Sequence, residues 1–217
     1  MKITEVTTGA GRREFIDFPK RLYRNDPNWV CPLDSEMEAV FDRGRNAAFG
    51  HGEAVRWLLT DTTGKTIGRV AAFIDEIRSK ANRQPTGGMG FFEVIESREA
   101  AFMLFDTARQ WLTERGMKAM DGPINFGEND NYWGLLVEGF VQPGFGMPYN
   151  KPYYRKYFEE YGFRTYFEQY SYHKDVASVE VFPERFRKIA EWISKRPGYA
   201  YRHFEFSQSQ QFAADMV

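Results

Sequence analysis

The chain has 217 residues, which suits one large domain or one domain with part of a second. Hydrophobic residues make up 42% and aromatic residues 17%, a composition that supports a full core and argues against global disorder. With 29 basic and 30 acidic residues, the formal net charge of -1 gives no long-range field to attract nucleic acid or an anionic membrane, so neither is expected as a partner.

Hydrophobic periodicity and turn residues predict helices and strands in a mixed α/β order. The clearest helix is 98–115, with Ser97 as its N-cap and Gly116 as its stop. Strand 87–96 is apolar on both faces and should lie inside the sheet. In chain order the predicted elements are strand 2–7, helix 12–24 with a kink at Pro19, helix 34–42, hairpin strands 54–61 and 65–75, strand 87–96, helix 98–115, strand 118–124, irregular segment 125–147, helix 151–161, strand 164–174, helix 183–195, strand 199–206 and a helix from 208.

Several enzyme classes lack their motifs here. The histidines His51, His173 and His203 are scattered and fit no metal-binding pattern, so no metal is expected. The sequence contains no Walker loop, no Rossmann glycine motif and no GxSxG elbow. Cys31 is the only cysteine, and no apolar run approaches the length of a membrane span. These features lead us to expect a cytoplasmic protein.

The element order and two local stretches resemble the acyl-CoA-dependent N-acyltransferases of the GNAT superfamily. One is GFFEVIES, the strand that leads into the helix at Arg98; the superfamily holds the coenzyme A pyrophosphate at this place. The other is YFEEYGF at 157–163, which is similar to the end of a later superfamily helix. More narrowly, 90–172 resembles a group of longer bacterial proteins with two GNAT-like halves, through GFFE, WLTERGM, GPINFGEND, GLLVEGF and MPYNKPYY.

The resemblance implies a GNAT-like fold, with a mixed, mostly antiparallel sheet and helices on both faces. It implies a GNAT-like domain over 1–180, followed over 181–217 by a connecting helix and the start of a truncated second GNAT-like segment. It also implies acetyl-CoA or another acyl-CoA as cofactor. The residues that would bind this cofactor are Ile95, Ser97, Arg98 and Ala100.

Two positions depart from the superfamily pattern. The loop Q/R-x-x-G-x-G/A is replaced by 95–100, which has no glycine and carries two carboxylates that stabilise the helix but repel phosphate. Phe158 stands where the superfamily often has its general-acid tyrosine, so Tyr154 or Tyr157 would have to protonate the thiolate. Both tyrosines also fit as core residues.

Glu93 is the candidate general base, because it lies in an apolar strand where an unpaired carboxylate is costly. Burial would raise its pKa toward the range useful for taking a proton from an amine. The structural alternative is a carboxylate that is hydrogen-bonded to a neighbouring strand or emerges at a sheet edge.

Polar side chains after a strand provide candidates for binding the substrate amine, since open α/β sheets place ligands in loops at strand ends. Ordinary turn chemistry is the alternative, because Asn, Asp and Gly dominate turns. The candidates come from the segments GPINFGENDNYWG and MPYN and are Asn125, Glu128, Asn129, Asn131, Tyr149 and Asn150.

The leading hypothesis is an N-acyltransferase, or its N-terminal half, that transfers an acetyl group to a small-molecule amine. The second is a catalytically silent GNAT-like domain that binds substrate or supports a second, catalytic half. A third is a transferase of the Fem type that uses aminoacyl-tRNA, which the balanced charge disfavours. The acceptor, the acyl chain and the oligomeric state stay open.

Overall fold

The computed structural model describes residues 1–81, 84–127, 131–173 and 183–216. The chain divides into two compact units, Met1–Thr165 and Tyr166–Val217, and each is described by itself. The boundary between these units lies at Thr165, whereas the sequence predicts that the GNAT-like domain ends at 180. A compact unit and a family domain need not have the same ends, so the boundary at 180 stays a prediction.

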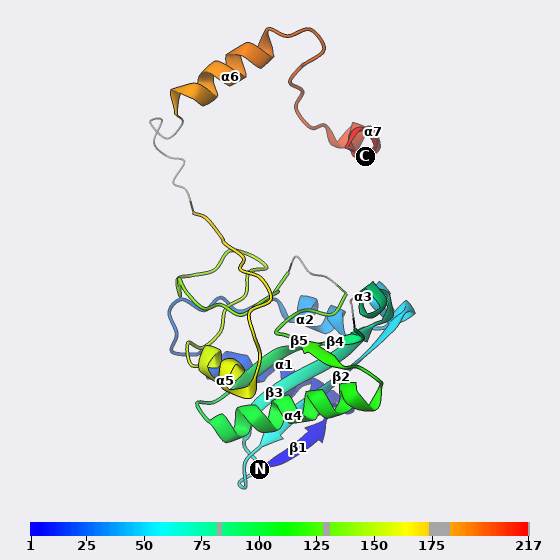
Figure 1. Cartoon of the computed structure of the whole chain (residues 1–217), viewed down its shortest axis with the longest axis vertical. Coiled ribbons are helices and arrows are strands. Elements are labelled where there is room, and N and C mark those ends of the chain that lie inside the picture. Colours follow the sequence, from blue (N-terminus) through cyan, green and yellow to red (C-terminus); the bar gives the residue numbers. More distant parts are fainter. Residues whose placement is uncertain (82–83, 128–130, 174–182, 217) are drawn as a thin grey trace. The chain divides into compact units, whose positions relative to one another are not determined.

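The first unit is built on a five-stranded sheet in the order β1-β2-β3-β4-β5 (Figure 1). The first four strands pair antiparallel, and β5 pairs parallel with β4. The mixed, mostly antiparallel sheet predicted from the sequence is therefore confirmed. The strands are β1 Lys2–Glu5, β2 Gly52–Thr60, β3 Thr66–Asp75, β4 Thr86–Val94 and β5 Ala119–Asp121.

Helices cover both faces of this sheet, as predicted. Leu104, Phe105 and Ala108 of α4 pack on one face together with α5, while Phe15 of α1 and Met37 of α2 pack on the other. Figure 1 shows α4 lying across the strands. The helices are α1 Gly9–Leu22, α2 Asp34–Val40, the 3-10 turn η1 Ala47–Gly50, α3 Glu76–Ala81, α4 Arg98–Glu114 and α5 Tyr154–Tyr161.

The caps and breakers in the sequence set the ends of these helices. Ser97 caps α4 as predicted, its Oγ accepting from the backbone N–H of Ala100 at 3.2 Å. The helix predicted at 12–24 begins earlier, at Gly9, because the Thr8 hydroxyl accepts from the N–H of Gly11. The η1 turn and α3 were not predicted, since both are too short to show a clear period.

The C-terminal half of β4 leaves the regular ladder on both sides. Its register against β3 shifts between Arg69 and Ala71, and Phe91 adopts a positive φ of 52° at this bulge. On the other side, β5 pairs only with Thr86–Gly88 and ends at Asp121, so the predicted strand 118–124 is shortened. Beyond Gly90, the edge of β4 is therefore open to side chains from other elements.

Two predicted strands are wrong. The described residues of 164–174 form no strand, and neither does the segment 199–206, whose last residue begins the 3-10 turn η3 Phe206–Gln208. A strand requires a hydrogen-bonded partner, and the described part of the second unit provides none. This unit contains α6 Glu184–Ser194 and α7 Ser209–Asp215, close to the predicted ranges. Large apolar residues of α6 are exposed, for example Phe186 and Ile189.

Candidate functional site

A cavity of about 120 Å³ lies beside the C-terminal half of β4. Its wall combines α1, the segment 29–34, the loops between 123 and 150, and the first turn of α5. Most of the wall is apolar, and four charged residues lie on it: Lys20, Asp34, Arg69 and Glu93. An apolar cavity with a few charged groups is the usual form of a small-molecule site.

Glu93 is held in this wall by two tyrosine hydroxyls. Its side chain is buried, and Tyr23 donates to Oε2 at 2.7 Å while Tyr154 donates to the same oxygen at 2.8 Å. Tyr23 comes from the C-cap of α1 and Tyr154 from the first residue of α5. The described residues place no hydrogen bond on Oε1, so this oxygen remains for a proton or a ligand.

Burial controls the protonation of this cluster. Desolvation raises the pKa of Glu93, and the charge of Arg69 and the hydrogen bonds from the two tyrosines oppose the rise without cancelling it. Burial also raises the pKa of Tyr23 and Tyr154 well above the ordinary value, and the charge of Glu93 adds to the rise because it disfavours a second negative charge nearby. Both hydroxyls therefore stay protonated and serve as donors.

The open edge of β4 is closed by tyrosines of α5. The backbone N–H of Val94 donates to the Tyr154 hydroxyl at 2.8 Å, and its carbonyl accepts from Tyr153 at 2.8 Å. A buried strand edge with no partner would leave these groups unsatisfied. Tyr154 thus connects the backbone of Val94 to the carboxylate of Glu93.

Arg69 is the second buried charge, and it pairs with Glu93 in the β3–β4 register. Its Nη1 donates to the carbonyl oxygen of Phe15 at 2.6 Å. In a regular helix this carbonyl would accept from the N–H four residues later, but that residue is Pro19, which has no N–H. The guanidinium therefore replaces a helical hydrogen bond that the sequence of α1 cannot make.

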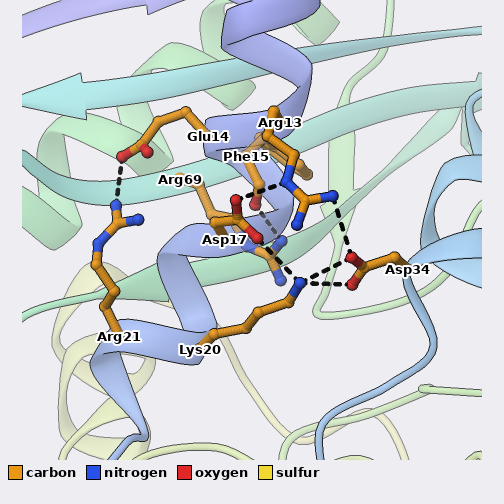
Figure 2. A network of polar contacts seen from close by, with 8 residues as sticks. All are labelled: Arg13, Glu14, Phe15, Asp17, Lys20, Arg21, Asp34 and Arg69. Carbon is orange, nitrogen blue, oxygen red and sulfur yellow. Dashed lines mark hydrogen bonds and ion pairs between the residues drawn. The ribbon is translucent and has the colours of Figure 1, made fainter.

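An ion-pair network lies beside this arrangement and joins α1 to the start of α2 (Figure 2). Lys20 Nζ lies 2.7 Å from Asp34 Oδ1 and 2.9 Å from Asp17 Oδ1, and Arg13 contacts both carboxylates. Lys20 and Asp34 are about one-third exposed, so they belong to the rim of the cavity. Their charges largely compensate each other.

The predicted substrate-binding residues are only partly brought together. Asn125, Tyr149 and Asn150 line the cavity, whereas Asn131 is not among its wall residues. The Asn150 side chain is occupied, because its Oδ1 accepts from the N–H of Leu136 and its Nδ2 donates to the carbonyl of the same residue. The predicted residues Glu128 and Asn129 lie outside the described residues.

The other two predicted substrate-binding residues on the wall, Asn125 and Tyr149, also form hydrogen bonds within the protein. The Oδ1 of Asn125 accepts from the N–H of Phe126 at 2.9 Å. The Tyr149 hydroxyl donates to Asp26 at 2.9 Å, and Lys151 pairs with the same carboxylate. These contacts fix the loops of the wall.

The predicted cofactor-binding residues lie at the N-terminus of α4, away from the cavity wall. The N–H of Ser97 donates to the carbonyl of Ile95, and the N–H of Ala100 donates to the Ser97 hydroxyl. Arg98 forms an ion pair with Glu160 at 2.8 Å and lies over the ring of Phe102. A phosphate at a helix N-terminus would bind backbone N–H groups and a cationic side chain. In this turn the N–H groups of Ser97 and Ala100 and the Arg98 side chain already have partners.

Of the two tyrosines proposed as the general acid, only Tyr154 reaches the cavity. Tyr157 packs in the core cluster of α4, α5 and the sheet, and it is not a wall residue. Phe158 is also buried there, with its ring 4.8 Å from that of Phe105. These three aromatic residues of α5 therefore all belong to the core cluster, and Tyr154 also lines the cavity.

Sequence reasoning missed Tyr23 and Arg69. Tyr23 gave no signal, because its contact with Glu93 joins residues 70 positions apart. Arg69 did give one, since a single arginine interrupts the apolar strand sequence IGRVAAFI. A charged residue in such a run requires a buried partner or a ligand.

Two other features are absent from the part of the chain that the structure describes. No helix among them is long and apolar enough to cross a membrane. No group of three or more His, Cys, Asp or Glu side chains within the described ranges could hold a metal ion.

No known protein-family profile matches the chain. In sequence it is 34% identical over 181 residues to the bacterial ceramide synthase of Caulobacter vibrioides, covering 81% of this chain and 46% of that protein. It is 32% identical over 152 residues to protein YghO of Escherichia coli K12, covering 70% of this chain and 38% of that protein. The chain therefore spans less than half the length of either relative.

Solved structures with a similar chain path include acetyltransferases. A "predicted acetyltransferase with acetyl-CoA" from Clostridium acetobutylicum matches with a TM-score of 0.48 and 15% identity over 79% of this chain and 95% of that one. An acetyltransferase of the GNAT family from Staphylococcus aureus Mu50 matches with a TM-score of 0.40 and 16% identity over 57% of this chain and 73% of that one. The chain is thus similar in sequence to a bacterial ceramide synthase and to YghO, and the solved structures with a similar chain path include one acetyltransferase of the GNAT family.

Proposed function

We propose that this chain carries the acceptor side of an N-acyl transfer, in which an amine is acylated by an acyl-CoA thioester. The observation that supports it is Glu93, a buried carboxylate on the wall of an apolar cavity, with one oxygen anchored by two tyrosines. The raised pKa of this carboxylate suits a group that accepts a proton from an amine.

In the proposed step the amine nitrogen attacks the thioester carbonyl carbon. A carbon–nitrogen bond forms and the carbon–sulfur bond breaks, so the products are an amide and the coenzyme thiolate. Glu93 takes the proton that the nitrogen loses. The thiolate takes a proton from solvent, since a free thiol has a pKa of about 8.5.

This scheme gives Tyr154 a positioning role in place of the general-acid role considered from the sequence. Its pKa is raised well above the ordinary value, which makes it a weak proton donor toward a thiolate. As a hydrogen-bond donor it holds Glu93 in one orientation. Tyr23 does the same from the other side.

The name of one relative supports amide formation. A ceramide is the amide of a fatty acid with a long-chain amino alcohol, and the chain is 34% identical to a bacterial ceramide synthase. The apolar wall of the cavity, which includes Ile16, Met37 and Leu135, suits an acceptor with a hydrocarbon chain. We therefore place a long-chain amine ahead of a small polar one.

The second candidate is a silent GNAT-like domain that supports catalysis by another part of a longer protein. The N-terminus of α4 favours it, because Ser97 caps its own helix and Arg98 is paired with Glu160. Phe158 in place of a tyrosine favours it too. In this case the coenzyme would bind elsewhere, and Glu93 would only recognise the amine.

The test compares wild type with Glu93→Gln, and uses Glu159→Gln as the control because Glu159 is an exposed residue of α5. Each is incubated with octylamine and either acetyl-CoA or palmitoyl-CoA, and free thiol and amide are measured. We expect thiol release by wild type, a loss of about 10² to 10⁴ in kcat for Glu93→Gln, and no change in the control. Amine binding without thiol release by wild type would favour the silent domain.

A further inference from the structure

The cavity holds a second charged group for which the proposed reaction gives no role. Arg69 lies opposite Glu93 in the β3–β4 register, and both side chains line the cavity. Arg69 is 6% exposed, and burial lowers its pKa while the charge of Glu93 opposes the change. A buried arginine is normally kept only where several partners satisfy its donors.

The structure satisfies this guanidinium only in part. Nη1 donates to the carbonyl of Phe15, which fixes the orientation of the group (Figure 2). Nε is buried and has no hydrogen-bond partner in the described structure. No direct ion pair joins Arg69 to Glu93 among the described residues. A buried donor without a partner requires an explanation, and an unfilled ligand site is one.

The other charged groups of the wall do not supply a partner for the Nε of Arg69. Lys20 and Asp34 lie at the rim and pair with each other at 2.7 Å. Inside the rim, the charged groups of the described wall are therefore one carboxylate and one guanidinium, carried by adjacent strands. Directly opposed residues of an antiparallel pair have Cα atoms about 4.5–5.5 Å apart. Their side chains can contact two atoms of the same small group.

We propose that the cavity selects amines that carry an oxygen acceptor on the neighbouring carbon, with the amine at Glu93 and the oxygen at Arg69. This inference rests on the proposed function, and it makes Arg69 a specificity-determining residue. A hydroxyl and a carboxylate share the required chemistry, because each oxygen accepts from a guanidinium. A simple alkylamine lacks this oxygen and leaves the buried donor unpaired.

The test measures binding by calorimetry without any acyl donor. The probes have equal carbon chains: octylamine, 2-amino-1-octanol and 2-aminooctanoic acid. For wild type we expect at least one oxygen-bearing probe to bind about ten to a hundred times more tightly than octylamine, as one hydrogen bond to a charged group would give. Comparison of the alcohol with the acid shows which oxygen is preferred.

The variant that removes the guanidinium is Arg69→Met in a Pro19→Ala background, where the new N–H can satisfy the Phe15 carbonyl and protect folding. Pro19→Ala alone is its control. We expect the control to keep the preference for the oxygen-bearing probe and the double variant to lose it while still binding octylamine.

Three results would overturn the inference: equal binding of all probes to wild type, binding of none, or a preference that survives in the double variant. Acylation of the same probes is measured separately. A clear preference in binding without acylation would support the role of Arg69 and refute the proposed function, so the two failures are distinguishable.

Discussion

The hydrogen bond between Arg69 and Phe15 can be tested by a double-mutant cycle with Pro19. In wild type the Phe15 carbonyl depends on Arg69, because Pro19 provides no N–H. Pro19→Ala restores a helical donor to the same carbonyl. Arg69→Met should therefore be more destabilising with proline at position 19 than with alanine.

The size of the difference follows from the burial of the bond. Arg69 and Phe15 are both buried, and Nη1 lies 2.6 Å from the carbonyl oxygen. Removing the donor leaves a buried carbonyl unsatisfied, which costs about 1–3 kcal/mol. With alanine at position 19 this cost largely disappears. The loss of attraction between Arg69 and Glu93 is the same in both backgrounds and cancels in the cycle.

Urea unfolding of the four proteins, followed by circular dichroism, gives the coupling energy. We expect the effects of the two substitutions to differ from additivity by about 1–3 kcal/mol in the stated direction. Additivity within about 0.5 kcal/mol would refute the reasoning, since the Phe15 carbonyl would then not depend on either donor.

Three further predictions concern the same site. Tyr154→Phe should be more destabilising than Tyr23→Phe by about 1–3 kcal/mol in urea unfolding, because Tyr154 also accepts from a buried N–H of β4; equal losses would contradict this. The pKa of Glu93 is raised in the folded state, so ionisation of its carboxyl group opposes folding. The free energy of unfolding of Glu93→Gln relative to that of wild type should therefore increase as pH rises above 4.5. A difference between the two proteins that stays constant from pH 4 to about 8 would argue against this. Gly90→Ala should lower the free energy of unfolding by at least about 3 kcal/mol, since the new Cβ would lie 1.9 Å from a backbone carbonyl oxygen after β5. Gly64 has positive φ but open space around it, so Gly64→Ala should lower it by only about 1–2 kcal/mol in the same thermal unfolding assay.

The elements of the first unit were predictable where local pattern and packing agree. Helix α4 shows this, because its apolar period, its Ser97 cap and its Gly116 stop all indicate the same boundaries. The segment 164–174 shows the opposite case: it alternates like a strand, but Tyr166 is 87% exposed and no described strand pairs with it. Alternation in sequence measures a preference, whereas a ladder needs a partner that the sequence does not reveal.

The candidate site was predictable in one residue and not in its surroundings. Glu93 could be found because a carboxylate in an apolar strand is costly wherever that strand lies. Its partners Tyr23 and Tyr154 lie 70 and 61 positions away, so no local pattern connects them. The predicted cofactor residue Arg98 lies on α4, outside the cavity wall, and its role stays a prediction.

Two missing backbone hydrogen bonds explain why these particular side chains surround Glu93. Pro19 leaves the Phe15 carbonyl without its helical donor, and Arg69 supplies one. The early end of β5 leaves the N–H of Val94 without a ladder partner, and Tyr154 accepts from it. Each replacement side chain is thereby held at a fixed place next to the carboxylate. The positions of the cation and of the hydroxyl donor in the cavity are therefore determined by backbone requirements first, and any selectivity for an acceptor follows from those positions.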